Sequence, residues 1–217
     1  VLAAIPDTAE NDTLAAVLRR ERIPFVRGPE EQLATRLWLA ADVQERDLLA
    51  GPADAIVRIT GDCPLIDPAV VDEVVVEWRR LAEPHAALDP VVEQWRPEAP
   101  VGYVSNVWPA VARTWPEGLD AEVMTRRLLE ELRGRSDDPL AESSPSEWIW
   151  RHHDFVKTFA VCQEPVPPPY ADLHWSVDTA EDLEGARRIY ERLPEGFAWE
   201  QIIQEFGPLS LPEIAKA

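Results

Sequence analysis

Two aspartates follow stretches of sequence that are typical of buried strands. Asp62 lies two residues beyond the β-branched stretch 54–60, and Asp178 directly follows the stretch 173–177. Ligands in open α/β sheets bind beyond the carboxyl ends of the strands, so two such acids in one parallel sheet can converge. Mg²⁺ prefers one or two carboxylates together with phosphate oxygens and water. The sequence therefore predicts a magnesium site that is held by Asp62 and Asp178.

Each aspartate also has a purely structural interpretation. Aspartate often closes turns, and Asp62 follows Gly61, which would let the backbone turn sharply. Asp178 precedes Thr179, and both residue types are common helix caps. On this interpretation neither carboxylate binds a ligand. It is their joint position at two strand ends that favours the metal site.

The segment 113–123, with the sequence RTWPEGLDAEV, holds a third group of acids. A turn at residues 116–118 would place Asp120 and Glu122 on the same side of an extended segment, because side chains alternate along extended backbone. Their carboxylates could contact sugar hydroxyls, or they could be solvated acids in a very acidic protein. The sequence leaves both interpretations open.

Several functional classes are excluded by composition and by missing motifs. The formal charge of −19 repels phosphodiester backbones and argues against a nucleic-acid groove. The G-x-x-x-x-G-K, G-x-G-x-x-G, C-x-x-C and H-E-x-x-H patterns are absent. His152 and His153 could bind a metal or transfer a proton, but a polar helix end is the favoured interpretation. Two cysteines, and no apolar run near the roughly 20 residues of a membrane span, favour a cytoplasmic protein.

Strands and helices are expected to alternate, which favours a parallel, layered α/β sheet in a single domain of residues 1–217. The expected strands are residues 1–5, 23–26, 54–60, 103–107, 155–162 and 173–177. The expected helices are residues 12–18, 30–49 (as one helix or two), 68–81, 124–132, 180–193 and 199–206. Residues 83–100 are expected to form a surface excursion, and residues 137–146 a loop.

Two of these helices have recognisable start signals. Asp67 is expected to cap the helix that begins with Pro68, because proline suits a first helical turn. Thr179 is expected to cap the helix 180–193, with Glu181 and Asp182 favouring its N-terminus through the helix dipole. The side chains of this second helix that are expected to point inward are Leu183, Ala186, Ile189 and Tyr190.

With these motifs in order, the sequence resembles the cytidylyltransferase family of the spore-coat polysaccharide biosynthesis protein F type. It is more distantly similar to acylneuraminate and CMP-KDO cytidylyltransferases. The resemblance extends over residues 1–193 and rests on four motifs in the expected order. These motifs are VRITGDCPLID (57–67), YVSN (103–106), RTWPEGLDAEV (113–123) and LHWSVDTAEDL (173–183).

The resemblance implies a Rossmann-like, three-layer α/β/α nucleotide-diphospho-sugar transferase fold with a mostly parallel central sheet. It also implies that Mg²⁺ is bound by Asp62 of the G-D-x-P-L loop and by Asp178 of the V-D-T-x-E-D motif. Arginines near the nucleotide and polar residues near the acceptor would be substrate-binding. The family positions match Arg36, Arg58, Asn106, Asp120 and Glu122 in this sequence.

The implied reaction is the transfer of CMP from CTP to a sugar, a sugar acid or a related acceptor, with release of pyrophosphate. The family's first strand and its glycine- and arginine-containing phosphate loop would precede Val1. Residues 144–148 (SPSEW) differ from the E-H-V-T-x-Y helix start that is frequent in the family, which leaves the acceptor open. By analogy with the family, the protein would be cytoplasmic and could form a homodimer. Two alternatives are a catalytically inactive domain that binds a ligand or partner, and a glycosyltransferase that uses a nucleotide-sugar.

Overall fold

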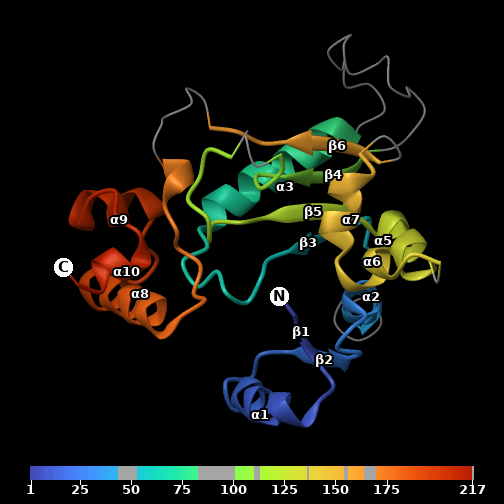
Figure 1. Cartoon of the computed structure of the whole chain (residues 1–217), viewed down its shortest axis with the longest axis horizontal. Coiled ribbons are helices and arrows are strands. Elements are labelled where there is room, and N and C mark those ends of the chain that lie inside the picture. Colours follow the sequence, from blue (N-terminus) through green and yellow to red (C-terminus); the bar gives the residue numbers. More distant parts are fainter. Residues whose placement is uncertain are drawn as a thin grey trace. The chain divides into compact units, whose positions relative to one another are not determined.

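The structure is a computed structural model that describes residues 1–43, 53–82, 101–109, 113–135, 137–153, 156–163 and 170–216. The surface excursion expected at residues 83–100, and the end of the helix expected at residues 30–49, lie outside these residues. Strands and helices alternate along the chain, as predicted (Figure 1). The chain divides into two compact units. Unit 1 comprises Val1–Ile56 and Met124–Lys157, and unit 2 comprises Val57–Val123 and Thr158–Ala217.

Unit 1 begins with a β-α-β arrangement. Strand β1 (Ala3–Pro6) pairs in parallel with β2 (Phe25–Gly28), and the connection contains the 3-10 turn η1 (Ala9–Asn11) and helix α1 (Asp12–Arg20). The helix starts where expected, whereas β2 starts two residues later than the predicted residue 23. The small core of this arrangement consists of Ile5, Ala15, Leu18, Ala3 and Phe25.

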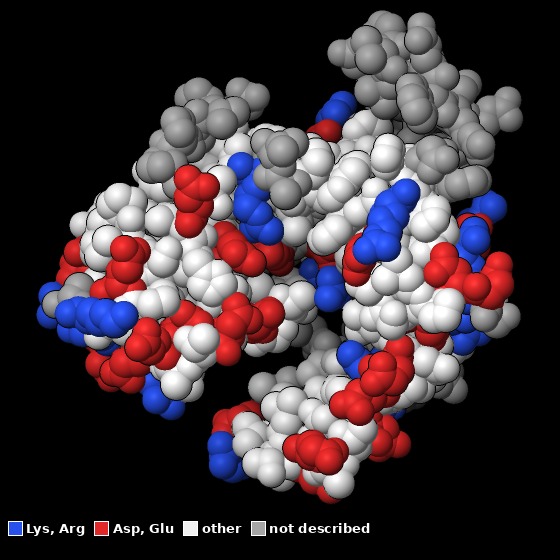
Figure 2. Space-filling view, in the orientation of Figure 1, with Lys and Arg blue, Asp and Glu red and all other residues white. Residues whose placement is uncertain are grey.

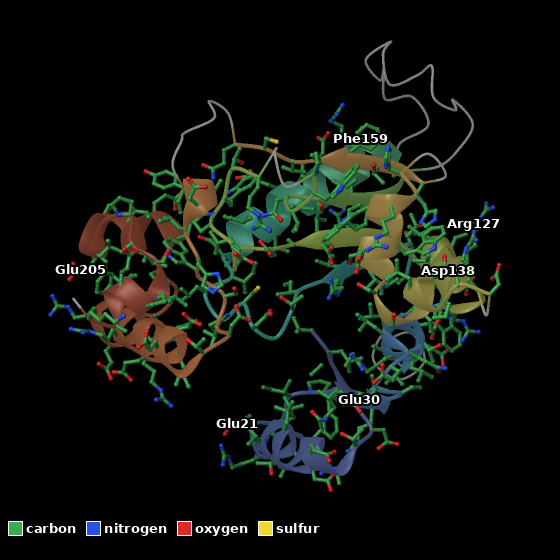
Figure 3. All side chains as sticks on the ribbon, in the orientation of Figure 1. Glu21, Glu30, Arg127, Asp138, Phe159 and Glu205 are labelled. Carbon is green, nitrogen blue, oxygen red and sulfur yellow. The ribbon has the colours of Figure 1, made fainter. Side chains whose placement is uncertain are left out.

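The rest of unit 1 is helical. Helix α2 packs against β1, β2, α5 and α6. The helices of this group are α2 (Leu33–Val43), α5 (Arg126–Arg133), α6 (Pro139–Ser143) and α7 (Pro145–Arg151). The prediction of a loop at residues 137–146 is therefore wrong. Pro139 and Pro145 each stand at a helix start, where the missing N–H costs nothing. The carboxylate of Asp138, labelled in Figure 3, accepts from the backbone N–H of Leu140 at 3.2 Å and so caps α6.

A four-stranded sheet has the order β3-β5-β4-β6 (Figure 1). Its strands are β3 (Ala55–Arg58), β5 (Glu122–Thr125), β4 (Val101–Ser105) and β6 (Lys157–Ala160). The β-branched stretch 54–60 is typical of a buried strand, such as one in the middle of a parallel sheet, but β3 lies at the end of this order. Val57 and Ile59 are 42% and 43% exposed. A β-branched run specifies a strand, but the position of that strand depends on partners that are encoded elsewhere in the chain.

The segment around Met124 also differs from the prediction. Residues 124–132 were expected to be helical, yet Met124 lies in β5 and helix α5 begins at Arg126. The side-chain oxygen of Thr125 accepts from the backbone N–H of Leu128 at 3.2 Å. This N-cap starts the helix two residues later than the pattern of apolar residues suggested.

Unit 2 contains helix α3 (Pro68–Ala82), which packs against β4. The predicted cap is confirmed, because one carboxylate oxygen of Asp67 accepts from the N–H of Ala69 at 2.8 Å. The other oxygen accepts from the N–H of Trp199, the first residue of α9 (Trp199–Phe206), at 2.9 Å. The buried Asp67 thus satisfies the start of two helices, and α9 has the bounds that the sequence predicted.

The C-terminal part of unit 2 consists of η4 (Tyr170–Asp172), α8 (Ala180–Arg192), α9 and α10 (Leu211–Ile214). The expected inward face of α8 is partly wrong, since Leu183 and Tyr190 are 40% and 56% exposed. Ala186 and Ile189 are buried as predicted, and Gly185 is buried as well. A Cβ on Gly185 would lie only 2.1 Å from the carbonyl oxygen of Leu211, so this close approach sets the buried face of the helix. None of the described helices is long and apolar enough to cross a membrane.

Candidate functional site

The two predicted metal-binding loops are neighbours in unit 2. The backbone N–H of Val177 donates to the carbonyl oxygen of Asp62 at 2.8 Å, so the loop after β3 is joined to the residue before Asp178. Asp62 is exposed, and 57% of the Asp178 side chain is exposed. The structure therefore brings together two segments that lie more than a hundred residues apart in the sequence, and both carboxylates are accessible to solvent.

The loop around Asp62 is closed by other residues. The backbone N–H of Cys63 donates to the carbonyl oxygen of Thr60 at 3.3 Å, and the Thr60 hydroxyl lies 3.0 Å from the Cys63 sulfur. Burial raises the pKa of the Cys63 thiol to about 12, and the nearby Asp120 and Asp62 carboxylates add to this. Gly61 does not have a positive φ, and a Cβ there would meet nothing within 4 Å. The expected need for glycine at this turn is therefore not found.

The segment 173–177 was expected to be a strand but forms a single parallel bridge, between Glu117 and His174. The N–H of Glu117 donates to the carbonyl of Leu173 at 2.9 Å, and the N–H of Trp175 donates to the carbonyl of Glu117 at 2.7 Å. Pairing cannot extend along the partner segment, because Pro116 has no N–H and the chain turns after Glu117.

Gly118 holds the expected turn at residues 116–118 against this bridge. The turn is present, with the N–H of Leu119 donating to the carbonyl of Pro116 at 3.2 Å. Gly118 has a φ of 105°, and a Cβ there would lie 2.5 Å from the carbonyl carbon of Trp175. Glycine is required here for both reasons, and its close approach locks the segment 113–122 to the segment 173–178.

Helix α8 is capped without the Asp178 carboxylate. The N–H of Asp182 donates to the Thr179 hydroxyl at 3.2 Å, and the N–H of Thr179 donates to the Asp182 carboxylate at 2.7 Å. This capping box confirms Thr179 as the cap. Burial acts to raise the pKa of Asp182, but its hydrogen bonds from Thr179 and Asp178 outweigh burial and lower the pKa. The structural interpretation of Asp178 as a cap is therefore not needed.

His174 is a candidate residue that the sequence analysis did not single out. Its Nδ1 lies 3.1 Å from a carboxylate oxygen of Glu117, and its Nε2 lies 3.1 Å from Oδ2 of Asp178. Ionised carboxylates only accept hydrogen bonds, so both ring nitrogens can donate to these acids when the ring is protonated. The pKa of His174 is raised, mainly by the hydrogen bond to Glu117, against the lowering effect of burial. The spacing H-x-x-x-D in the motif LHWSVD was the only signal that could have indicated this contact.

Metal-ligating atoms of His174, Asp178 and Asp182 lie within 4.8 Å of one another. The Oδ2 atom of Asp182 is already used by the capping box, where it also accepts from the N–H of Asp178 at 3.1 Å. Exposed carboxylate oxygens are the hard ligands that Mg²⁺ prefers. The carboxylates of Asp62 and Asp178 are exposed and that of Asp182 is buried, and the magnesium site stays a prediction.

Glu122 and Arg58 form an ion pair on neighbouring strands of the sheet. Only 5% of the Glu122 side chain and 20% of the Arg58 side chain are exposed. The hydroxyl of Tyr103 donates to the other oxygen of Glu122 at 2.6 Å. In the structure these two residues therefore stabilise the sheet, and their predicted contacts with substrate remain predictions.

Asp120 and Asn106 lie in the same part of unit 2. Asp120 forms a two-point ion pair with Arg113, at 2.5 and 3.2 Å. Asn106 is 2% exposed, and its amide donates to the carbonyl of Leu119 at 2.8 Å and accepts from the N–H of Ala121 at 2.9 Å. Asn106 thus fixes the backbone on both sides of Asp120, while its predicted role as an acceptor contact stays a prediction.

Arg36 belongs to unit 1, where it lies on α2. Its guanidinium donates to the carbonyl oxygens of Pro29 and Glu30, both at 3.0 Å. A Cβ on Gly28 would lie 3.2 Å from Cγ of Arg36, so the absence of a side chain at Gly28 lets the Arg36 stem approach β2. Figure 2 shows acidic side chains on the visible faces of both units, as the net charge of −19 requires.

Comparison with known proteins identifies the fold. No family model and no curated protein matches the sequence significantly. The solved structure of a cytidylyltransferase from Leptospira borgpetersenii serovar Hardjo-bovis (strain JB197) is similar to this chain, with a TM-score of 0.75 at 23% sequence identity. The similarity covers 99% of this chain and 78% of that one. The chain therefore shares the α/β fold of that protein, and a Rossmann-like α/β fold is what the sequence predicted.

Proposed function

We propose that this protein is a Mg²⁺-dependent nucleotidyltransferase that transfers CMP from CTP to a sugar, a sugar acid or a related acceptor. An acceptor oxygen would form a bond to the α-phosphorus of CTP, the bond from that phosphorus to the β-phosphate oxygen would break, and pyrophosphate would leave. The fold is shared with a protein described as a cytidylyltransferase, which supports this class of reaction.

One observation carries the proposal. The hydrogen bond from the Val177 N–H to the Asp62 carbonyl joins the two loops that the sequence marks for metal binding, at 2.8 Å. Because both loops follow strand-like segments and both carboxylates are exposed, we expect Asp62 and Asp178 to share one ligand. Neither carboxylate is used by the protein to cap a helix.

We assign Asp62 and Asp178 to hold Mg²⁺ beside the triphosphate. When bound, Mg²⁺ would neutralise negative charge on the phosphate oxygens. Asp120 lies close enough to this loop for its charge to help raise the pKa of the Cys63 thiol, and its carboxylate is paired with Arg113. We assign Asp120 to contact acceptor hydroxyls. The remaining assigned contacts are Arg36 and Arg58 to the nucleotide and Asn106 and Glu122 to the acceptor.

Pyrophosphate release tests the proposal directly. The full chain is incubated with Mg²⁺, each of the four common nucleoside triphosphates and a panel of sugar acids and sugar phosphates. We expect pyrophosphate with CTP and one class of acceptor. Asp62→Asn and Asp178→Asn should each lower the rate by about a hundredfold or more, because charge stabilisation of this kind contributes several kcal/mol to the barrier.

The alternatives give different results in the same assay. Turnover of a UDP-sugar without pyrophosphate would favour glycosyl transfer, and CTP binding without turnover of any acceptor would favour a binding domain. His153→Gln, which changes an exposed residue of unit 1 that has no assigned role in the site, serves as the comparison variant and should keep the wild-type rate. Undiminished turnover in Asp62→Asn or Asp178→Asn would overturn the metal assignment.

A further inference from the structure

We infer that His174, held in place by Glu117, is a positioning residue that orients the Asp178 carboxylate and presents one of its two oxygens to the cation. This inference rests on the proposed function, in which Asp178 binds Mg²⁺. It adds a named pair of residues, Glu117 and His174, that touch neither substrate nor metal. They act through the Asp178 side chain.

The two oxygens of Asp178 differ in their surroundings. Oδ2 lies 3.1 Å from Nε2 of His174 and accepts from the Ser176 hydroxyl at 3.3 Å. Oδ1 has no hydrogen-bonding partner among the residues that the structure describes. An exposed carboxylate otherwise rotates freely between rotamers. Holding Oδ2 therefore leaves Oδ1 as the oxygen that is available to a ligand.

His174 is itself held from the opposite side. Its Nδ1 contacts the Glu117 carboxylate at 3.1 Å, and its backbone is fixed by the bridge to Glu117 and by the Ser210 hydroxyl, which accepts from the His174 N–H at 3.0 Å. A third of the His174 side chain is exposed, so the ring lies at the surface between two acids. Both contacts of the ring point to an orienting role.

Linking the two segments does not require the imidazole ring. The bridge between Glu117 and His174 consists of backbone hydrogen bonds at 2.9 and 2.7 Å, and Gly118 packs directly against the backbone of Trp175. A carboxylate that binds a metal is usually hydrogen-bonded by an outer residue, which fixes its direction. The side-chain contacts from Glu117 to His174 and from His174 to Asp178 match this arrangement. A contact that only linked the two segments would not need to involve the Asp178 carboxylate.

Metal binding tests the inference without relying on catalysis. The affinity of the full chain for Mn²⁺ alone, a spectroscopic substitute for Mg²⁺, is measured by electron paramagnetic resonance. His174→Ala should weaken Mn²⁺ binding by about 10- to 100-fold, as loss of an outer-shell partner does. His174→Gln should lose less, because its amide can still donate to Asp178. The Mn²⁺ affinity of Glu117→Gln should lie between those of the wild type and His174→Ala, since the ring then loses its contact with an ionised carboxylate.

Two further variants separate the possible outcomes. His153→Gln changes an exposed histidine of unit 1 and should leave the Mn²⁺ affinity unchanged. If Asp178→Asn abolishes Mn²⁺ binding while His174→Ala, His174→Gln and Glu117→Gln bind as wild type does, the positioning inference is overturned and the proposed metal site survives. If Asp178→Asn also binds as wild type does, both are overturned. Circular dichroism of each variant verifies that the chain is folded.

Discussion

Glu122 and Asp178 are both acids that the sequence singles out as candidate site residues, yet their surroundings in the structure differ. The Glu122 side chain is 5% exposed, and its two oxygens contact Arg58 and Tyr103. The Asp178 side chain is 57% exposed, and only one of its oxygens has partners among the described residues. Glu122 is the first residue of β5, and Asp178 follows the segment that the bridge at His174 joins to Glu117.

The difference shows how a very acidic chain separates framework acids from acids that are available to a ligand. A buried carboxylate must be paired, because removing its charge from water is costly. Once Glu122 is paired, its charge is no longer offered to a cation. Asp178 keeps its solvent exposure and is held by hydrogen bonds to a single oxygen, so its charge remains available. Burial and partners, rather than residue type, separate the two roles.

The free energy of unfolding should be most sensitive to the contact that Gly118 makes between the segments 113–122 and 173–178. Gly118→Ala is expected to lower the free energy of unfolding by about 3 kcal/mol, since it combines a left-handed backbone with a steric overlap. Urea denaturation followed by tryptophan fluorescence measures this change. Gly196→Ala is the matched control, with a φ of 76° and no atom within 4 Å of the added Cβ. It should cost about 1 kcal/mol. Equal losses in the two variants would contradict the proposed locking contact.

The comparison predicts that replacing Glu122 destabilises the protein more than replacing Asp178 does. Glu122→Gln should lower the free energy of unfolding by about 2 kcal/mol, because it removes the charge of Glu122 from its ion pair with the partly buried Arg58. Asp178→Asn should change it by less than about 1 kcal/mol, as is typical of an exposed ion pair. Urea denaturation of both variants provides the measurement. A larger loss in Asp178→Asn than in Glu122→Gln would reverse the assignment of framework and ligand-binding acid.

The smallest expected effect concerns the pH dependence of stability near Asp178. The pKa of His174 is raised in the folded state, mainly through Glu117. Its contribution to stability is therefore fully present below the unfolded pKa of about 6.5 and is lost as the pH rises through the folded value. His174→Gln should lower the melting temperature more at pH 5.5 than at pH 9. If the melting temperatures of wild type and His174→Gln differ by the same amount at both pH values, the charge on the ring does not contribute to stability.

Local features of the chain could be predicted from the sequence because their causes are local. Asp67 before Pro68, and Thr179 before the helix 180–193, are start signals that act within one helical turn, and both caps are present. The turn at residues 116–118 follows from proline and glycine in the same way. The alternation of strands and helices likewise predicted the α/β fold.

The predictions that the structure contradicts concern properties that depend on residues far away in the sequence. The stretch 54–60 does form a strand, but its place at the end of the strand order is decided by β5. The stretch 173–177 has the alternation of a strand, yet Pro116 and the turn at Gly118 limit its pairing to one bridge. The inward face of α8 is set by the approach of the Leu211 carbonyl to Gly185.

The sequence by itself determined the candidate acids, the helix caps at Asp67 and Thr179 and the fold class, since residue type, capping and periodicity act over a few positions. The tertiary structure decided which of those acids is buried in an ion pair and which is exposed and oriented by His174. That decision requires side chains from separate segments to meet, as Val177 meets Asp62 and His174 meets Glu117. Spacing along the chain does not encode such contacts, because they depend on how the intervening chain folds and on which surfaces lose their water.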